Sequence, residues 1–139
     1  MFIFCFSRHW QTLFFFQLIT IYAPNILNRN ECENFFEEID TYLKRDTPTI
    51  LCGDFNMVED FLLDREGGNP REQHTWGSQA LKQLKKHHDL IDIWRFLNPN
   101  KKEFTWNSYY DNIKSRLDRF YISSSLRDFV RNTGISPCS

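Results

Sequence analysis

The segment Thr49–Asn56 reads Thr-Ile-Leu-Cys-Gly-Asp-Phe-Asn, and it decides how the rest of the chain is interpreted. A short apolar run that stops at a glycine is typical of a buried β-strand. Residues just beyond such a strand lie on the rim of a sheet, where α/β proteins place their sites. Asp54 and Asn56 are therefore candidate site residues, and the alternative is an ordinary polar turn.

Asp54 and Asn56 are separated by a single residue, Phe55. If the extended backbone continues through Phe55, the acid and the amide point to one side and Phe55 points into the core. A carboxylate can accept a proton, while a carboxamide can donate hydrogen bonds to an anionic oxygen. The pair therefore predicts a site where a proton moves beside a negatively charged group.

The composition indicates a single globular domain. The chain has 139 residues, of which 41% are hydrophobic, and a formal net charge of −1. This length can bury a core, and the balance of apolar and charged residues is not that of a disordered chain. The small net charge excludes gross electrostatic attraction to nucleic acid, although it leaves room for a local basic face.

The four cysteines are not arranged for metal binding. Cys5, Cys32, Cys52 and Cys138 form no Cys-x-x-Cys pair, and no histidine lies at a zinc-finger spacing from them. Cys32 and Cys52 fall within an expected helix and strand, so we interpret them as core thiols. Core thiols favour a reducing compartment, and we expect an intracellular protein of the nucleus or cytoplasm.

Residues 1–17 form a phenylalanine-rich leader. They show neither the basic start nor the small-residue cleavage site of a signal peptide, and Arg8 and His9 interrupt the apolar run that a membrane helix would need. We therefore expect no membrane segment. We interpret the leader as an edge strand or irregular segment that can derive from outside the domain, and residues 18–139 as the domain.

The first half of the chain alternates strand, helix and strand. Leu18–Tyr22 is β-branched and apolar, and Pro24 ends it. Asn28 or Asn30 can cap a helix that ends before Pro48 and leads into the central strand. This order is the pattern of an α/β unit. The helix is expected to bury an apolar face formed by Cys32, Phe35, Phe36, Ile39 and Leu43.

The second half is less regular. Residues 57–74 are mostly polar and predict a long surface loop, which a second, lysine-faced helix follows. We interpret His87 and His88 as the end of that helix rather than a ligand pair, because adjacent helical positions do not face one another. The later elements expected are a half-buried helical turn at 89–97, a short strand at 104–106 and a short helix at 123–130.

Residues 115–122 predict another strand. Phe120 belongs in the core, and Asp118 shares its parity, so Asp118 begins the series that points inward. An acid that enters on the core side needs either a partner or a functional task. The structural partner would be Arg116 or Arg119.

Four segments are each weak evidence when taken alone: Ile21–Asn25, Gly53–Asn56, Phe104–Trp106 and Ser115–Phe120. In this order and spacing they resemble the endonuclease/exonuclease/phosphatase family. The nearest resemblance is to the apurinic-type endonuclease domains of LINE-like, non-LTR retrotransposons. Segments that also look like those domains are Met57–Asp60, Leu63–Arg65 and Asp92–Arg95.

The resemblance implies an α/β fold, here a partial two-sheet β-sandwich flanked by helices. It implies hydrolysis of a DNA phosphodiester by water with a divalent metal, usually Mg²⁺. Such chemistry needs donors and a cation aimed at the anionic phosphoryl oxygens, together with a base for the water. DNA is therefore the expected partner, whereas the oligomeric state and the metal ligands stay open.

The resemblance also assigns roles to individual residues. Asp54 matches the acid that orients or deprotonates the attacking water, and Asn56 matches the amide that helps to hold the phosphate in its transition state. Tyr22 matches a phenol that hydrogen-bonds near the phosphate, and Asn25 matches a phosphate-contacting amide. Asp118 matches an acid that orients a catalytic histidine. Simpler interpretations are an edge-strand aromatic for Tyr22 and a turn residue for Asn25.

The sequence departs from the family pattern at both ends. No glutamate precedes Glu31, although the family takes a metal-binding glutamate from an earlier strand, and the chain stops at Ser139, where a Ser-Asp-His motif is due. The histidines in the wrong segments to serve Asp118 are His9, His74, His87 and His88. We therefore expect a domain truncated at both ends, with weak or no activity.

Two other interpretations stay open. One is a non-catalytic remnant or nucleic-acid-binding piece of a degenerate retroelement, whose missing strands would leave sheet edges unpaired. The other keeps the family but takes a phosphoinositide or sphingolipid phosphodiester as substrate, and the retroelement-like segments at 63–65 and 104–106 argue against it. Phe104 and Trp106 are expected in the core rather than as a platform for nucleobases.

Overall fold

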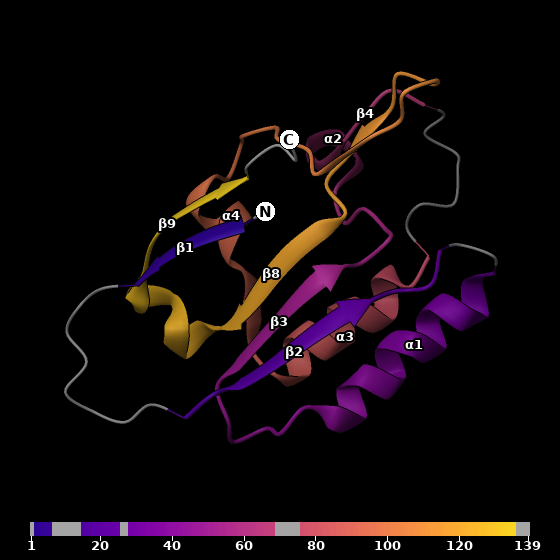
Figure 1. The fold of residues 1–139 in the computed structure, drawn as a ribbon. Helices are drawn as coiled ribbons and strands as arrows, with labels where there is room; N and C mark the ends of the chain where they lie inside the picture. The colour runs from indigo at the N-terminus through magenta and orange to yellow at the C-terminus, as the bar shows by residue number, and fades with distance from the viewer. Residues whose placement is uncertain (1, 7–14, 26–27, 69–75, 136–139) are drawn as a thin grey trace.

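The computed structural model describes residues 2–6, 15–25, 28–68 and 76–135 (Figure 1). The helices are α1 (Arg29–Tyr42), α2 (Phe61–Asp64), α3 (Ser78–His87), α4 (Ile93–Leu97) and the 3₁₀ helix η1 (Ser124–Phe129). The strands are β1 (Phe2–Phe6), β2 (Gln17–Tyr22), β3 (Thr49–Asp54), β4 (Arg65–Glu66), β5 (Leu90–Asp92), β6 (Trp106–Asn107), β7 (Lys114–Ser115), β8 (Asp118–Ser123) and β9 (Val130–Ile135).

A four-stranded sheet in the order β2-β3-β8-β5 is the centre of the molecule. β2 and β3 run parallel, joined by α1 as the alternation predicted, and β8 runs antiparallel to both β3 and β5. A second sheet pairs β1 with β9, and a small three-stranded sheet has the order β4-β7-β6. These sheets, with helices packed beside them, confirm the predicted α/β class and its partial sandwich.

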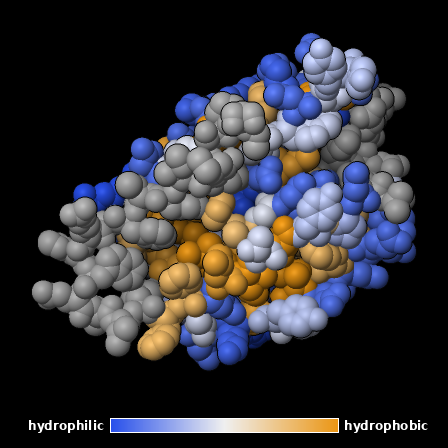
Figure 2. Space-filling view, viewed as in Figure 1, coloured by the Kyte–Doolittle hydropathy of each residue, from blue (hydrophilic) through white to orange (hydrophobic). Residues whose placement is uncertain are grey.

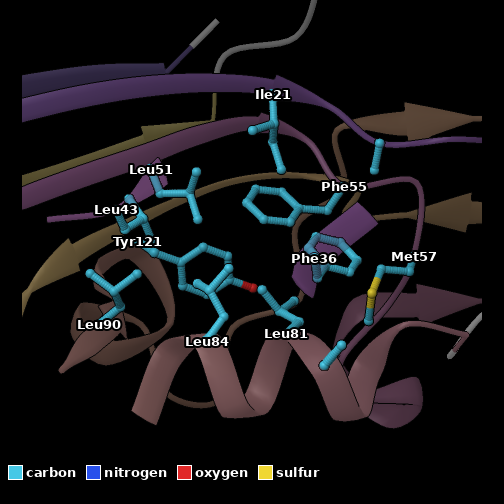
Figure 3. Close-up of a cluster of buried hydrophobic side chains, with 12 residues drawn as sticks. Ile21, Phe36, Leu43, Leu51, Phe55, Met57, Leu81, Leu84, Leu90 and Tyr121 are labelled. Atoms are coloured by element: carbon cyan, nitrogen blue, oxygen red, sulfur yellow. The ribbon is translucent and has the colours of Figure 1, made fainter. Parts of the chain in front are cut away.

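The larger core lies between the central sheet and the helices α1 and α3 (Figure 3). Phe36 of α1 stacks on Phe55 at 6.1 Å between ring centroids, and Phe55 meets Tyr121 edge to face at 5.0 Å. Leu81 and Leu84 of α3 close this core from below in the view. The apolar face predicted for α1 is therefore turned toward this core, and α3 packs against it with its lysine face outward.

The opposite face of the central sheet carries a second, smaller core. Ile122 packs there with Leu126 of η1 and Val130 of β9. Beside it lies an apolar pocket of about 240 Å³, lined by Phe16, Leu18, Ile50, Phe120, Ile122, Leu126 and Val130. Figure 2 shows the continuous apolar surface on this face of the molecule.

Phe120 packs against the smaller core, as expected, but the other side of β8 is covered as well. Tyr121 and Arg119 lie on the other parity and are 0% exposed, because that side of β8 faces the larger core. The alternation of apolar and polar residues identifies the inner face of a strand only when its other face is exposed to solvent. Both faces of β8 are covered.

Several predicted boundaries also need correction. The expected loop at 57–74 contains α2 and β4 in its described part, and the expected helical turn at 89–97 begins with β5. The expected strand at 115–122 is divided into β7 and β8 around Arg116, and the short strand β6 starts only at Trp106, whose ring is 44% exposed rather than in the core. The last helix is a 3₁₀ helix, and β9 follows it.

The phenylalanine-rich leader contributes the strand β1, which pairs antiparallel with β9. Cys32 and Cys52 are free and buried, as predicted for core thiols, whereas Cys138 lies outside the described residues. Among the helices described, none has both the length and the apolar character needed to cross a bilayer.

Candidate active site

Tyr22, Asp54 and Asp118 form one row across three adjacent strands. Tyr22 is paired with Asp54 in the β2–β3 register, and Asp54 is paired with Asp118 in the β3–β8 register. Residues directly opposite in neighbouring strands present their side chains on the same face of a sheet. The sequence-predicted residues at positions 22, 54 and 118 are thus brought together at the rim where β2 and β3 end.

Gly53 sets the close approach of β2 and β3 beside this row. Its φ is +134°, and a Cβ built there would lie 1.9 Å from the carbonyl oxygen of Ile21. Side chains are rarely tolerated at such a φ, and no side chain fits against a backbone oxygen at that distance. Glycine is therefore required immediately before Asp54, which explains why the apolar run stops there.

Asp54 is half-buried, and its carboxylate is locally oriented. Its Oδ1 accepts a hydrogen bond from the backbone N–H of Asn56 at 2.8 Å. Burial raises the pKa of Asp54 above its ordinary value, the bond from Asn56 and the charge of Arg119 lower it, and the charge of Asp118 raises it. A carboxylate with a raised pKa is a better proton acceptor than an ordinary aspartate.

Asn56 does not lie on a continuation of β3. Its φ is +48°, so the backbone turns there, and the prediction that Asp54 and Asn56 share a direction through an extended Phe55 is wrong. The carboxamide Nδ2 instead donates to the carbonyl oxygen of Ala23 at 2.6 Å, just beyond β2. Phe55 is buried in the core as expected.

Asp118 is held through its backbone. The N–H groups of Leu117 and Asp118 both donate to Thr105 Oγ1 at 3.0 Å, and Phe55 N donates to the Leu117 carbonyl oxygen at 3.0 Å. The alternative of an ion pair with a neighbouring arginine is wrong within the described residues. Arg116 pairs with Asp64 and Asp92 there, and Arg119 donates to backbone carbonyl oxygens.

Two predicted residues at and just beyond the end of β2 are exposed. Tyr22 is 73% exposed, and Asn25 is exposed three residues further on. Thr105 and Gly53 are the site residues to which sequence reasoning assigned no role. Both lie inside the family-like segments at 53–56 and 104–106, but only the fold shows what each residue contacts.

The described residues do not enclose a metal ion. Among the described residues, no group of three or more His, Cys, Asp or Glu side chains is placed to hold a metal. Asp54 and Asp118 supply two carboxylates, and Mg²⁺ is commonly held by one or two carboxylates, with water and substrate phosphate completing its octahedron. His87 and His88 both bind Asp40, at 3.0 and 2.7 Å, between α3 and α1.

Solved structures share the fold of this chain. An AP endonuclease from Archaeoglobus fulgidus superposes with a TM-score of 0.62 at 17% identity, over 80% of this chain and 50% of that one. The 3′ phosphatase NExo from Neisseria, bound to a product DNA hairpin, gives a TM-score of 0.62 at 15% identity, over 91% and 59%. The chain thus spans about half the length of these structures.

Sequence comparisons are more specific. The "Transposon TX1 uncharacterized 149 kDa protein" of Xenopus laevis is 32% identical over 125 residues, which cover 86% of this chain and 9% of that protein. The model of the Endonuclease/Exonuclease/phosphatase family matches residues 12–139. The resemblance inferred from the four segments is confirmed, and the chain belongs to the endonuclease/exonuclease/phosphatase family.

Proposed function

We propose that this chain is part of a DNA endonuclease of the retrotransposon type, which hydrolyses phosphodiester bonds. The observation that carries the proposal is the row of Tyr22, Asp54 and Asp118 at one rim of the sheet. The similarity to a transposon protein favours a retroelement origin, and the DNA-bound state of one structural relative favours DNA as substrate. With DNA as the proposed substrate, the nucleus or cytoplasm is the proposed compartment.

Asp54 is the proposed base for the attacking water. Its carboxylate is oriented by the Asn56 N–H, and its raised pKa lets it take up a proton more readily than an exposed aspartate. Positioned acid–base groups of this kind contribute about 10²–10⁴-fold to a reaction rate. The substrate phosphate would lie at the open side of the row, over the exposed Tyr22.

The amides and the phenol are the proposed phosphate ligands. The contact of Asn56 with Ala23 uses one N–H of its carboxamide, and the second can donate to a phosphate oxygen. The exposed Tyr22 hydroxyl and Asn25 carboxamide can donate from the β2 side. Donors fixed before the reaction stabilise the charge that develops on the phosphoryl oxygens.

Asp118 is the proposed orienting acid, and Mg²⁺ is the proposed cofactor of the family chemistry. Asp54 and Asp118 would hold the ion together with water and the substrate phosphate, and the ion would supply positive charge at the phosphoryl oxygens. His87 and His88 bind Asp40 instead of Asp118, and His9 and His74 lie outside the described residues. We therefore propose slow hydrolysis by the 139-residue chain.

Nicking of supercoiled plasmid in Mg²⁺ tests the proposal. We expect slow nicking that Asp54→Ala reduces about 10²-fold or more. Asp46→Ala is the matched control, because Asp46 is an exposed aspartate in the turn before β3 and should leave the rate unchanged. Nicking that survives Asp54→Ala would refute the role of Asp54. Salt-sensitive DNA binding without any nicking would favour the non-catalytic, nucleic-acid-binding alternative.

A further inference from the structure

Three segments that the proposed reaction leaves without a role converge on one buried ion cluster. Asp64 comes from the end of α2, Asp92 and Arg95 come from the β5–α4 junction, and Arg116 lies between β7 and β8. Asp64 and Arg116 are each only 1% exposed. Segments up to 52 residues apart in the sequence thus meet two residues before Asp118.

The contacts within this cluster are directional. Arg116 donates two hydrogen bonds to Asp64, from Nε to Oδ1 at 2.8 Å and from Nη2 to Oδ2 at 3.1 Å. Its Nη2 also lies 2.8 Å from Asp92 Oδ2, while Arg95 Nη2 binds Asp64 Oδ1 at 2.5 Å. A two-pronged arginine–carboxylate pair fixes orientation as well as distance, which a lysine cannot do.

The backbone of Arg116 is held by the same partner. Arg116 N donates to the Asp64 carbonyl oxygen at 2.9 Å, so both the main chain and the side chain of Arg116 are tied to Asp64. The indole of Trp94 lies against the guanidinium groups of Arg95 and Arg116, at 4.9 and 5.1 Å from their central carbons. Arg116 therefore has little freedom to change rotamer.

Hydrogen bonds connect the cluster to the rim. Leu117 directly follows Arg116. Its carbonyl oxygen accepts a hydrogen bond from the backbone N–H of Phe55, which directly follows Asp54. Arg119 is fully buried and donates to the carbonyl oxygens of Met57 at 2.5 Å and Arg116 at 3.0 Å. A displacement of Arg116 would therefore move Asp118 relative to Asp54.

We propose that Arg116 and Asp64 are positioning residues, whose buried pair sets the placement of Asp118 opposite Asp54 at the rim. The proposal deepens the proposed function, because the placement matters only if the two acids act on one substrate. Net stabilisation does not explain the pair, since buried ion pairs are often no more stabilising than apolar residues of the same volume. Their directional geometry supplies what an apolar pair would lack.

Carbon-13 NMR of the side-chain carboxyl of Asp54 tests the placement without using activity. The charge of Asp118 raises the Asp54 pKa, so Asp118→Asn measures the full effect of removing that charge. Arg116→Lys keeps the charge and loses the fork, and Asp64→Asn keeps the shape and loses the charge. We expect both variants to lower the Asp54 pKa toward the Asp118→Asn value. In both variants the rate of amide hydrogen exchange should also rise at Leu117, by a factor at least ten times the factor at Leu51.

Asp40→Asn is the control for a merely structural effect. It weakens a contact between α1 and α3 that is remote in the fold from the rim, so it should lower the melting temperature and leave the Asp54 titration unchanged. If Arg116→Lys and Asp64→Asn behave like Asp40→Asn, the positioning role is refuted. Because this readout needs no turnover, it decides the proposal even if the wild-type chain nicks no DNA and the proposed function fails.

Discussion

Gly53→Ala should be among the most damaging single methyl additions in this protein. The new Cβ would lie 1.9 Å from the Ile21 carbonyl oxygen and 2.9 Å from the Ile21 carbonyl carbon and nitrogen, and the φ of +134° would itself be strained. The φ strain costs about 1–3 kcal/mol. Relief of the clash requires β2 and β3 to separate by about 1 Å or more, which weakens flanking ladder bonds worth about 1 kcal/mol each.

The expected loss is therefore about 3–5 kcal/mol, a large part of the stability of a small domain, which is about 5–15 kcal/mol. Urea unfolding followed by circular dichroism measures it. Gly134→Ala is the matched control, because a Cβ at Gly134 meets nothing within 4 Å, and it should change the free energy of unfolding by less than about 0.5 kcal/mol. Equal, small losses for both variants would refute the reasoning.

Four further predictions concern separate contacts. Burial raises the pKa of Asp40, yet hydrogen bonds from His87 and His88 bring that pKa below its ordinary value. The contribution of Asp40 to the free energy of unfolding should therefore be full above about pH 4 and lost as the pH falls further. Asp40→Asn should flatten the acid unfolding curve in that pH range. Tyr121→Phe removes a part-buried 2.6 Å hydrogen bond to Glu59 and should lower the free energy of unfolding by about 1–2 kcal/mol in urea, with the same urea m-value. Thr105→Val leaves two backbone N–H groups without their acceptor and should destabilise by about 1–3 kcal/mol, with faster amide exchange at the start of β8. As the pH is lowered, any nicking rate should begin to decline at a higher pH than an ordinary aspartate would give, because the ionised form of Asp54 is required and burial raises its pKa. A decline that begins only at or below about pH 4 would contradict the assignment of Asp54 as the base.

The regular elements were the predictable part of the fold. α1 and α3 repeat apolar residues at helical spacing, and β2 and β3 are short apolar runs with clear stops, so local pattern and tertiary structure agree. The short strands β4 and β5 were missed because two or three residues carry no readable period. Their pairing partners, not their own sequences, make them strands.

The histidine pair shows a different limit. Adjacent residues of a regular helix diverge, which argued against a shared ligand. His88, however, lies just past the end of α3 with φ −111° and ψ 12°, so helical geometry no longer separates the two rings. Both rings bind Asp40 of α1, because the divergence of adjacent side chains holds only within the helix, which ends at His87.

The placement of Tyr22, Asp54 and Asp118 at one rim was also predictable. Their motifs fall where strands end, and strand ends in an α/β sheet share a rim. The buried cluster around Arg116 was not predictable, because its partner Asp64 lies 52 residues earlier and inside a segment that looks like a polar loop. A polar residue in such a segment gives no local sign that it is only 1% exposed.

The acid pair at the rim favours a site over an ordinary turn. Asp54 and Asp118 are directly opposite in the β3–β8 ladder, where like charges are destabilising. Packing does not require two carboxylates there, and an asparagine at either position would relieve the repulsion. The surrounding contacts nevertheless hold both backbones in place, through Thr105 on one side and Gly53 on the other. A locally unfavourable pair whose backbones the fold holds in place supports the chemistry proposed at the rim.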